Sequence, residues 1–231
     1  MAILSIEHSD RLFWLGRYCE RVYTTIKEFA IRFDSMIELK DEDYNEYCIE
    51  QDIPNIYTSK EDFIKRYCFD ETDTNSIFSN LIRAYDNAVV LREEIGSETL
   101  AYVQLAVYAM NKAKTSEAPL VYLQKVVDNI VAFWGMADDD IDSECVRSML
   151  KLGKRVERID LYARMKMEKA ELQREMKRLS KRINRTGIRY STMKLAHLNY
   201  IMEMDEIPTD LVVEEIESLF DVRVNEDVVG L

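Results

Sequence analysis

The sequence predicts an all-α protein, a helical bundle of about six to eight helices in which two long helices repeat one motif. The 231 residues include only 6 Gly and 3 Pro, which favours long uninterrupted elements over a fold rich in turns. Apolar residues recur at steps of three and four, the spacing of one helix face. Hydrophobic residues make up 47% of the chain, enough for a substantial core, so we expect one domain over residues 1–231.

The helix boundaries follow from the apolar stripes and from capping residues. Residues 40–74 are acidic and interrupted by Pro54, so they are expected to form a connecting loop with one short helix. Gly96 should end a helix and Ser97 should cap the next one. Gly187 should end or bend the longest helix, and residues 222–231 are expected to be a loose tail. The expected helix ranges are 7–38, 60–67, 75–95, 98–113, 119–135, 142–184, 189–205 and 209–220.

The charge is unevenly distributed along the chain. The net charge is −12, yet residues 147–194 contain 16 Lys and Arg against 5 Asp and Glu. This segment either binds a polyanion or an acidic partner, or packs against acidic parts of its own chain or of a second subunit. We favour the second interpretation, because charge patterning alone rarely identifies a partner.

Several classes of site and location are disfavoured by composition. No stretch approaches the 18 apolar residues of a membrane span, and Met1–Asp10 lacks the features of a signal peptide, so we expect a cytoplasmic protein that does not bind membranes. The four cysteines include no CxxC pair and are interpreted as reduced core thiols. With only two histidines, a zinc or copper site is not expected, whereas carboxylates could still hold Mg²⁺; we assign no metal and no cofactor.

One motif occurs twice, 137 residues apart. The segment 14–22, WLGRYCERV, aligns with the segment 151–159, KLGKRVERI. Glycine within a helix costs about 0.5–1 kcal/mol relative to alanine, so a glycine in both copies suggests close approach of another backbone. We therefore expect the two motif helices to cross at Gly16 and Gly153, which brings together the motif acids and bases. Arg92 is expected to lie close to one of the motif carboxylates.

The repeated Leu-Gly-basic-x-x-Glu-Arg motif, with Asn75-Ser76-Ile77, Asp86-Asn87-Ala88 and Arg92, resembles the bacterial alpha-E domain family over about residues 7–168. The resemblance implies an all-α fold and a pathway that contains circularly permuted ATP-grasp peptide ligases and transglutaminase-like proteases. Residues 169–231 are expected to be a divergent basic helix followed by C-terminal helices.

The resemblance also assigns candidate site residues. Tyr85, Val89, Lys27 and Lys154 stand where the family usually has arginines, which argues against a full arginine cluster. Glu20 and Glu157 are the catalytic candidates if the protein is an enzyme. The binding candidates are Asp10, Arg17, Arg21, Asp86, Asn87, Arg92, Lys154, Arg158 and Arg164.

Three functions remain open from the sequence. The first is a non-catalytic or co-catalytic helical partner of an ATP-grasp-type amide ligase in peptide synthesis or modification, whose Glu/Arg cluster binds a peptide carboxylate or organises a docking face. The second is a stand-alone enzyme in which a motif glutamate is the general base and nearby arginines stabilise an anion. The third is polyanion binding through residues 174–194, although no nucleic-acid-binding module or nucleotide loop is present and nucleic acid is not the expected partner. A homo-oligomer is also left open.

Overall fold

The computed structural model describes residues 5–38 and 43–220, which form eleven α-helices. The predicted all-α fold is confirmed. The helices are α1 (Ile6–Glu38), α2 (Asp43–Glu50), α3 (Lys60–Phe69), α4 (Ile77–Val90), α5 (Arg92–Ile95), α6 (Ser97–Thr115), α7 (Pro119–Asp139), α8 (Glu144–Arg164), α9 (Lys169–Ile183), α10 (Thr192–Glu203) and α11 (Thr209–Glu217).

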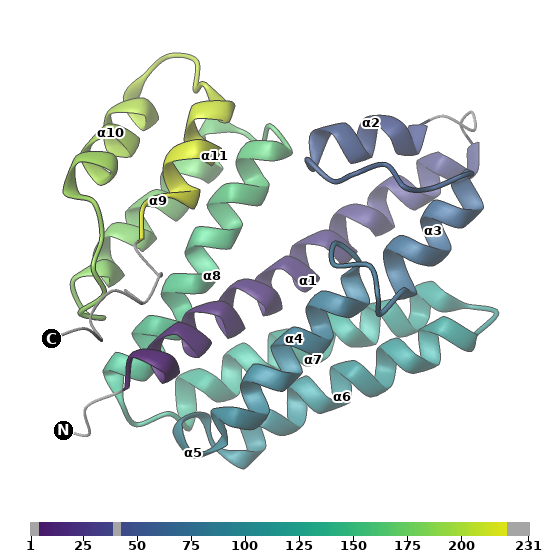
Figure 1. Ribbon diagram of the computed structural model, residues 1–231, viewed down its shortest axis with the longest axis horizontal. Coiled ribbons are helices and arrows are strands. Elements are labelled where there is room, and N and C mark those ends of the chain that lie inside the picture. Colours follow the sequence, from purple (N-terminus) through teal and green to yellow (C-terminus); the bar gives the residue numbers. More distant parts are fainter. Residues whose placement is uncertain (1–4, 39–42, 221–231) are drawn as a thin grey trace, which may run out of the picture.

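Helix α1 runs through the middle of the molecule and organises the packing (Figure 1). It packs most extensively against α8 and also contacts α4 and α7, while α6 and α7 form an antiparallel pair beside them. Helices α9 and α11 pack against α8, and α10 contacts α9 and α11. Buried apolar residues from α1 to α11 form one hydrophobic cluster, in which Leu12, Leu15, Cys19 and Val22 represent α1. These residues follow one another at steps of three and four, so they share one face of α1, and that face lies in the core.

Serine side chains cap the beginning of several helices. Ser76 accepts a hydrogen bond from the Ser79 backbone N–H at 2.9 Å and thereby caps α4. Ser143 caps α8 in the same way. Gly96 adopts a positive φ of 83°, which glycine tolerates, and it ends α5 as predicted. Ser97 is the first residue of α6 rather than its cap.

The single helix predicted over 142–184 is wrong, because the chain turns at residues 165–168 and forms α8 and α9. The turn contains no Gly or Pro, and Lys166 adopts a left-handed φ of 51°. One straight helix of that length would extend about 65 Å. Folding back instead lets Leu172, Met176 and Leu179 of α9 become buried beside α8, and burial of apolar surface is the dominant gain in folding.

Smaller differences concern other helix ends. The segment expected to be mostly loop contains the additional helix α2, and α7 continues through Gly135 to Asp139. The helix expected over 75–95 is interrupted at Leu91, and Arg92 begins the four-residue helix α5. The expected loose tail at 222–231 lies outside the described residues.

Among the residues with described placement, no helix combines the length and the apolar character that crossing a membrane requires.

Candidate functional site

The two motif glycines lie where α1 and α8 touch, as predicted. A Cβ placed on Gly16 would clash with the carbonyl oxygen of Leu150, and a Cβ on Gly153 would clash with that of Phe13. Leu150 and Phe13 each stand three residues before the glycine of their own helix. The contact is therefore reciprocal, and it brings two backbones closer than any larger residue would permit.

Ion pairs across this contact follow the same reciprocal pattern. The residues Arg17, Glu20, Arg21, Lys154, Glu157 and Arg158 are called the motif cluster below. Glu157 of α8 accepts hydrogen bonds from Arg17 Nε at 2.6 Å and from Arg21 Nε. Glu20 of α1 accepts a hydrogen bond from Arg158 Nε and lies 4.0 Å from Lys154 Nζ. Each motif acid thus pairs with the bases of the opposite helix rather than with those of its own.

The two copies differ at their first basic position. Arg17 contacts Glu157 closely, whereas Lys154 stays at 4.0 Å from Glu20 and lies 3.9 Å from the centre of the Trp134 ring. The Oε2 atom of Glu20 is buried and accepts no hydrogen bond among the described residues. Burial lowers the pKa of Lys154 to about 7 despite the nearby Glu20. The second half of the cluster is therefore less tightly paired than the first.

Both motif acids are completely buried, with 0% exposure. Burial opposes ionisation of Glu157, but Arg21 and Arg17 outweigh it and hold its pKa below the usual value. Glu20 in turn raises the pKa of Arg158 against the effect of burial. Removing one partner of such a buried pair leaves an uncompensated charge and typically costs about 3–5 kcal/mol. The cluster is thus a strong determinant of how α1 and α8 pack.

The ion pairs continue beyond the cluster on both sides. Buried Glu175 of α9 pairs with Arg155 at 2.6 Å and with Arg178 at 2.6 Å. At the other end, Asp160 pairs with Arg164 at 3.0 Å. Burial, followed by the negative charge of Glu157, raises the pKa of Asp160 to about 6. Asp160 therefore takes up a proton at a higher pH than an ordinary aspartate does.

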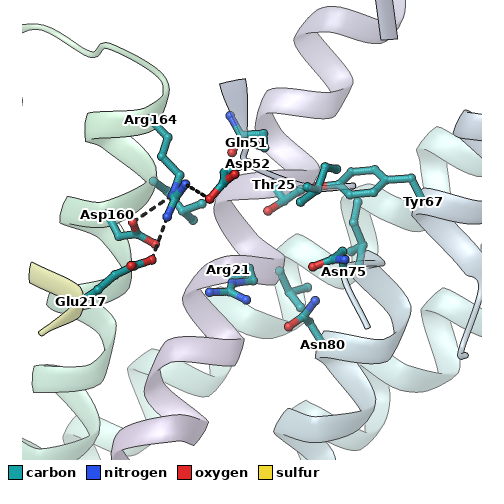
Figure 2. A pocket seen from close by; sticks show the side chains of 14 residues that line it. Arg21, Thr25, Gln51, Asp52, Tyr67, Asn75, Asn80, Asp160, Arg164 and Glu217 are labelled. Carbon is teal, nitrogen blue, oxygen red and sulfur yellow. Dashed lines mark hydrogen bonds and ion pairs between the residues drawn. The ribbon is translucent and has the colours of Figure 1, made fainter. Parts of the chain in front are cut away.

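A cavity of about 210 Å³ opens beside the cluster, between α1, α8 and the segments around α2 to α4. Arg21 belongs to both the cluster and the cavity wall (Figure 2). The lining residues are Arg21, Val22, Thr25, Gln51, Asp52, Ile53, Tyr67, Asn75, Ile77, Asn80, Asp160, Leu161, Arg164 and Glu217.

Two amides in the cavity wall have buried atoms without partners among the described residues. These atoms are Nε2 of Gln51 and Oδ1 of Asn80. The Nδ2 atom of Asn80 donates to the Ser76 carbonyl at 2.7 Å, which leaves its oxygen as the free group. A buried polar group without a partner costs about 1–3 kcal/mol. Such atoms in a cavity wall are typical of a binding site.

The structure separates the predicted site residues into groups. Six of them form the motif cluster, and Arg164 lines the cavity. Asp10, Asp86, Asn87 and Arg92 do not pair with the cluster in the described part of the chain. Asn87 accepts a hydrogen bond from Arg11 at 3.3 Å, Asp86 is exposed, and burial raises the pKa of Asp10.

The expected contact between Arg92 and a motif carboxylate is wrong. Arg92 is exposed on α5 and donates to Ser97 at 3.0 Å. The neighbouring Glu94 contacts His8, which places α5 near the beginning of α1. The prediction failed because α4 ends before Arg92, and the change of direction at Leu91 removes this side chain from the expected helix face.

Sequence reasoning missed the neutral side of the cavity. Gln51, Asn80 and Thr25 belong to no recognisable motif, and only the folded arrangement brings them together. Asn80 offers a weak signal, since it is a polar residue next to the apolar stripe of α4.

The basic segment 174–194 is partly neutralised by the chain itself. Arg174 and Arg178 pair with Glu175, and Arg185 pairs with Glu144 of α8 at 2.9 Å. These contacts agree with packing against acidic parts of the same chain. For Lys177, Lys181, Arg182 and Arg189, the described part of the chain provides no ion pair.

Comparison with known proteins identifies the family of this chain. A search of curated proteins and a search of solved structures each found no match. A family model described as a predicted alpha-helical domain with a conserved ER motif matches residues 7–198. The chain contains two Glu-Arg pairs, Glu20-Arg21 and Glu157-Arg158, and both belong to the motif cluster. Because the match covers most of the 231 residues, the chain belongs to the Alpha-E family.

Proposed function

We propose that this protein is a non-catalytic helical partner of an ATP-grasp-type amide ligase that makes or modifies a peptide. The resemblance of the motifs to the alpha-E family supports the choice of partner. The burial and pairing of both motif glutamates support the non-catalytic role. The burial of these glutamates is the observation that carries the proposal.

A general base must reach the proton that it removes, within hydrogen-bond distance or through one water. Glu20 and Glu157 are 0% exposed, and each carboxylate pairs with at least one arginine of the opposite helix. The low pKa of Glu157 further reduces its tendency to accept a proton. These features favour a role in holding α1 against α8, so that the surfaces of the bundle keep the shape that a partner binds.

The partnership is tested by tagging the chain in its native cells and identifying the proteins that co-purify. We expect an ATP-grasp-type ligase, and the complex should re-form from the two purified proteins. Failure of the purified ligase to bind the chain would refute the partnership.

The non-catalytic role is tested with Glu157→Gln in the reconstituted complex. The amide keeps the shape of the side chain but cannot compensate Arg17 and Arg21, so the variant should unfold more easily. Product formed per folded molecule should equal that of the wild type. A loss of turnover in variant protein that remains folded and bound would contradict the proposal.

A stand-alone enzyme is the second candidate, and one observation favours it. Asp160 lines the cavity, and burial raises its pKa to about 6, which suits a general base near neutral pH. In that case the reacting carboxylate is Asp160 rather than a motif glutamate. Turnover by the chain without the ligase, abolished by Asp160→Asn, would favour this candidate over the first.

A further inference from the structure

The cavity beside Arg21 has the features of a small-molecule site that is separate from the fully buried part of the motif cluster. Its wall is built from α1, from residues 51–53, from α3, from the beginning of α4, from the end of α8 and from α11. Segments far apart in the sequence thus supply the lining, as is usual for a binding site formed by the fold.

Buried polar groups in the wall require a partner. Gln51 is 8% exposed and Asn80 is 1% exposed, and each has one atom without a hydrogen bond among the described residues. Gln51 offers a donor and Asn80 an acceptor. A ligand that fits here must therefore both accept and donate hydrogen bonds.

The charges of the wall are separated. Arg164 binds Asp52, Asp160 and Glu217, and Figure 2 shows these carboxylates gathered around it on one side. Arg17 Nη2 also lies 3.9 Å from Asp160, so three acids face two bases on that side and leave an excess of negative charge at neutral pH.

Arg21 lies between this acidic group and the neutral side chains of Thr25, Asn75 and Asn80 (Figure 2). It donates to Glu157 through Nε, and the described residues provide no hydrogen bond to its terminal nitrogens. A guanidinium with free terminal nitrogens is well suited to a carboxylate. The cavity therefore presents a carboxylate-binding group next to an acidic group.

The volume limits the size of the ligand. The volume of the cavity is about 210 Å³. It is smaller than the range of about 300–1,000 Å³ that is usual for drug-sized ligands. A nucleotide or a peptide segment would extend out of a cavity of this volume.

We propose that this cavity binds a free amino acid, with the carboxylate on Arg21 and the ammonium group beside Asp160 and Glu217. The amides of Gln51 and Asn80 complete the hydrogen bonds of the ligand. This inference does not depend on the ligase partnership, because the chain alone supplies every group.

Isothermal titration of the purified chain with the standard amino acids, one at a time, tests the proposal. At least one should bind saturably with a Kd of about 1 mM or below. For that amino acid, the analogues that lack either the amine or the carboxylate should bind at least tenfold more weakly. Absence of binding by the whole panel would refute the proposal, as would equal binding of an analogue without the amine.

Two variants test whether the amino acid binds in this cavity. Gln51→Leu removes the buried Nε2 donor that has no partner and keeps the bulk, so the fold should persist while affinity falls at least tenfold. Arg21→Lys retains a cation for Glu157 but loses the bidentate recognition of a carboxylate. It should therefore lower the affinity for the amino acid by a similar factor. The control Gln124→Leu lies exposed on α7, outside the cavity, and should bind as the wild type does. Wild-type affinity in Gln51→Leu would place the ligand elsewhere and overturn the proposal, whatever the co-purification shows.

Discussion

Alanine at either motif glycine should separate α1 from α8. At Gly16 the added methyl group meets the backbone carbonyl of Leu150, and at Gly153 it meets that of Phe13. Backbone atoms in the middle of a helix cannot rotate away as a side chain can. The helices must therefore move apart, and the reciprocal ion pairs must lengthen with them.

The expected cost follows from three contributions. Alanine gains about 0.5–1 kcal/mol of helix propensity over glycine. Overpacking a tight contact costs about 1–3 kcal/mol. Separation by roughly 1 Å also forfeits a quarter to a half of the dispersion energy of the contact atoms, and it stretches the 2.6 Å contact between Arg17 and Glu157. Because breaking a buried ion pair costs about 3–5 kcal/mol, we expect a net loss of about 3 kcal/mol for each variant.

Urea unfolding monitored by circular dichroism measures these changes. Gly135→Ala is the matched control, because this glycine is also helical but its Cβ would meet nothing within 4 Å. The control should gain about 0.5–1 kcal/mol. In Gly16→Ala combined with Gly153→Ala, the loss should be smaller than the sum, since one separation relieves both clashes. If Gly16→Ala and Gly153→Ala were as stable as Gly135→Ala, the close backbone contact would be refuted.

Two further predictions concern charge. Asp160 has a pKa raised from 3.8 to about 6, so the folded protein holds a proton that the unfolded chain releases between these values, and stability falls as pH rises through this range. Asp160→Asn should therefore be more stable than the wild type by up to about 3 kcal/mol at pH 7, and the two proteins should be equally stable near pH 4. The unfolding free energies of both proteins are measured across this pH range. If they differed by the same amount at every pH, the raised pKa of Asp160 would be contradicted. For the basic segment, fluorescence anisotropy with mixed-sequence RNA at physiological salt should give a Kd above about 1 µM. A lower Kd that rises when the charges of Lys177 and Arg182 are reversed would show a polyanion site.

The contact between the motif helices could be predicted because the apolar periodicity and the repeated motif can both be recognised in the sequence without knowledge of the fold. The stripe through Leu12 and Leu15 indicates the core face, and a glycine in each copy indicates a close approach. The crossing then follows, because one close approach of the two helices in a bundle explains why each helix has a glycine at this position. The exchange of partners, in which Glu20 pairs with α8 and Glu157 pairs with α1, requires the relative position of two helices and became visible only in the structure.

The features that escaped prediction depend on tertiary contacts. No Gly or Pro marks the turn at Lys166, and the turn forms because α9 buries its apolar face by folding back. Arg92 was misplaced because one change of backbone direction at Leu91 alters the face on which every later residue lies. The cavity combines Gln51 with Asn80, which periodicity cannot relate because they lie on separate elements.

The central claim is that the motif cluster joins α1 to α8 through exchanged ion pairs. A double-mutant cycle on unfolding free energies tests it most directly, with Arg17→Met combined with Glu157→Gln and, separately, with Glu20→Gln. Across the helices, Arg17 and Glu157 should couple by about 2–3 kcal/mol. Within α1, Arg17 and Glu20 should couple by less than about 0.5 kcal/mol, since a neighbouring helical pair that makes no direct contact contributes little. Strong coupling within α1 and none between the helices would contradict the account.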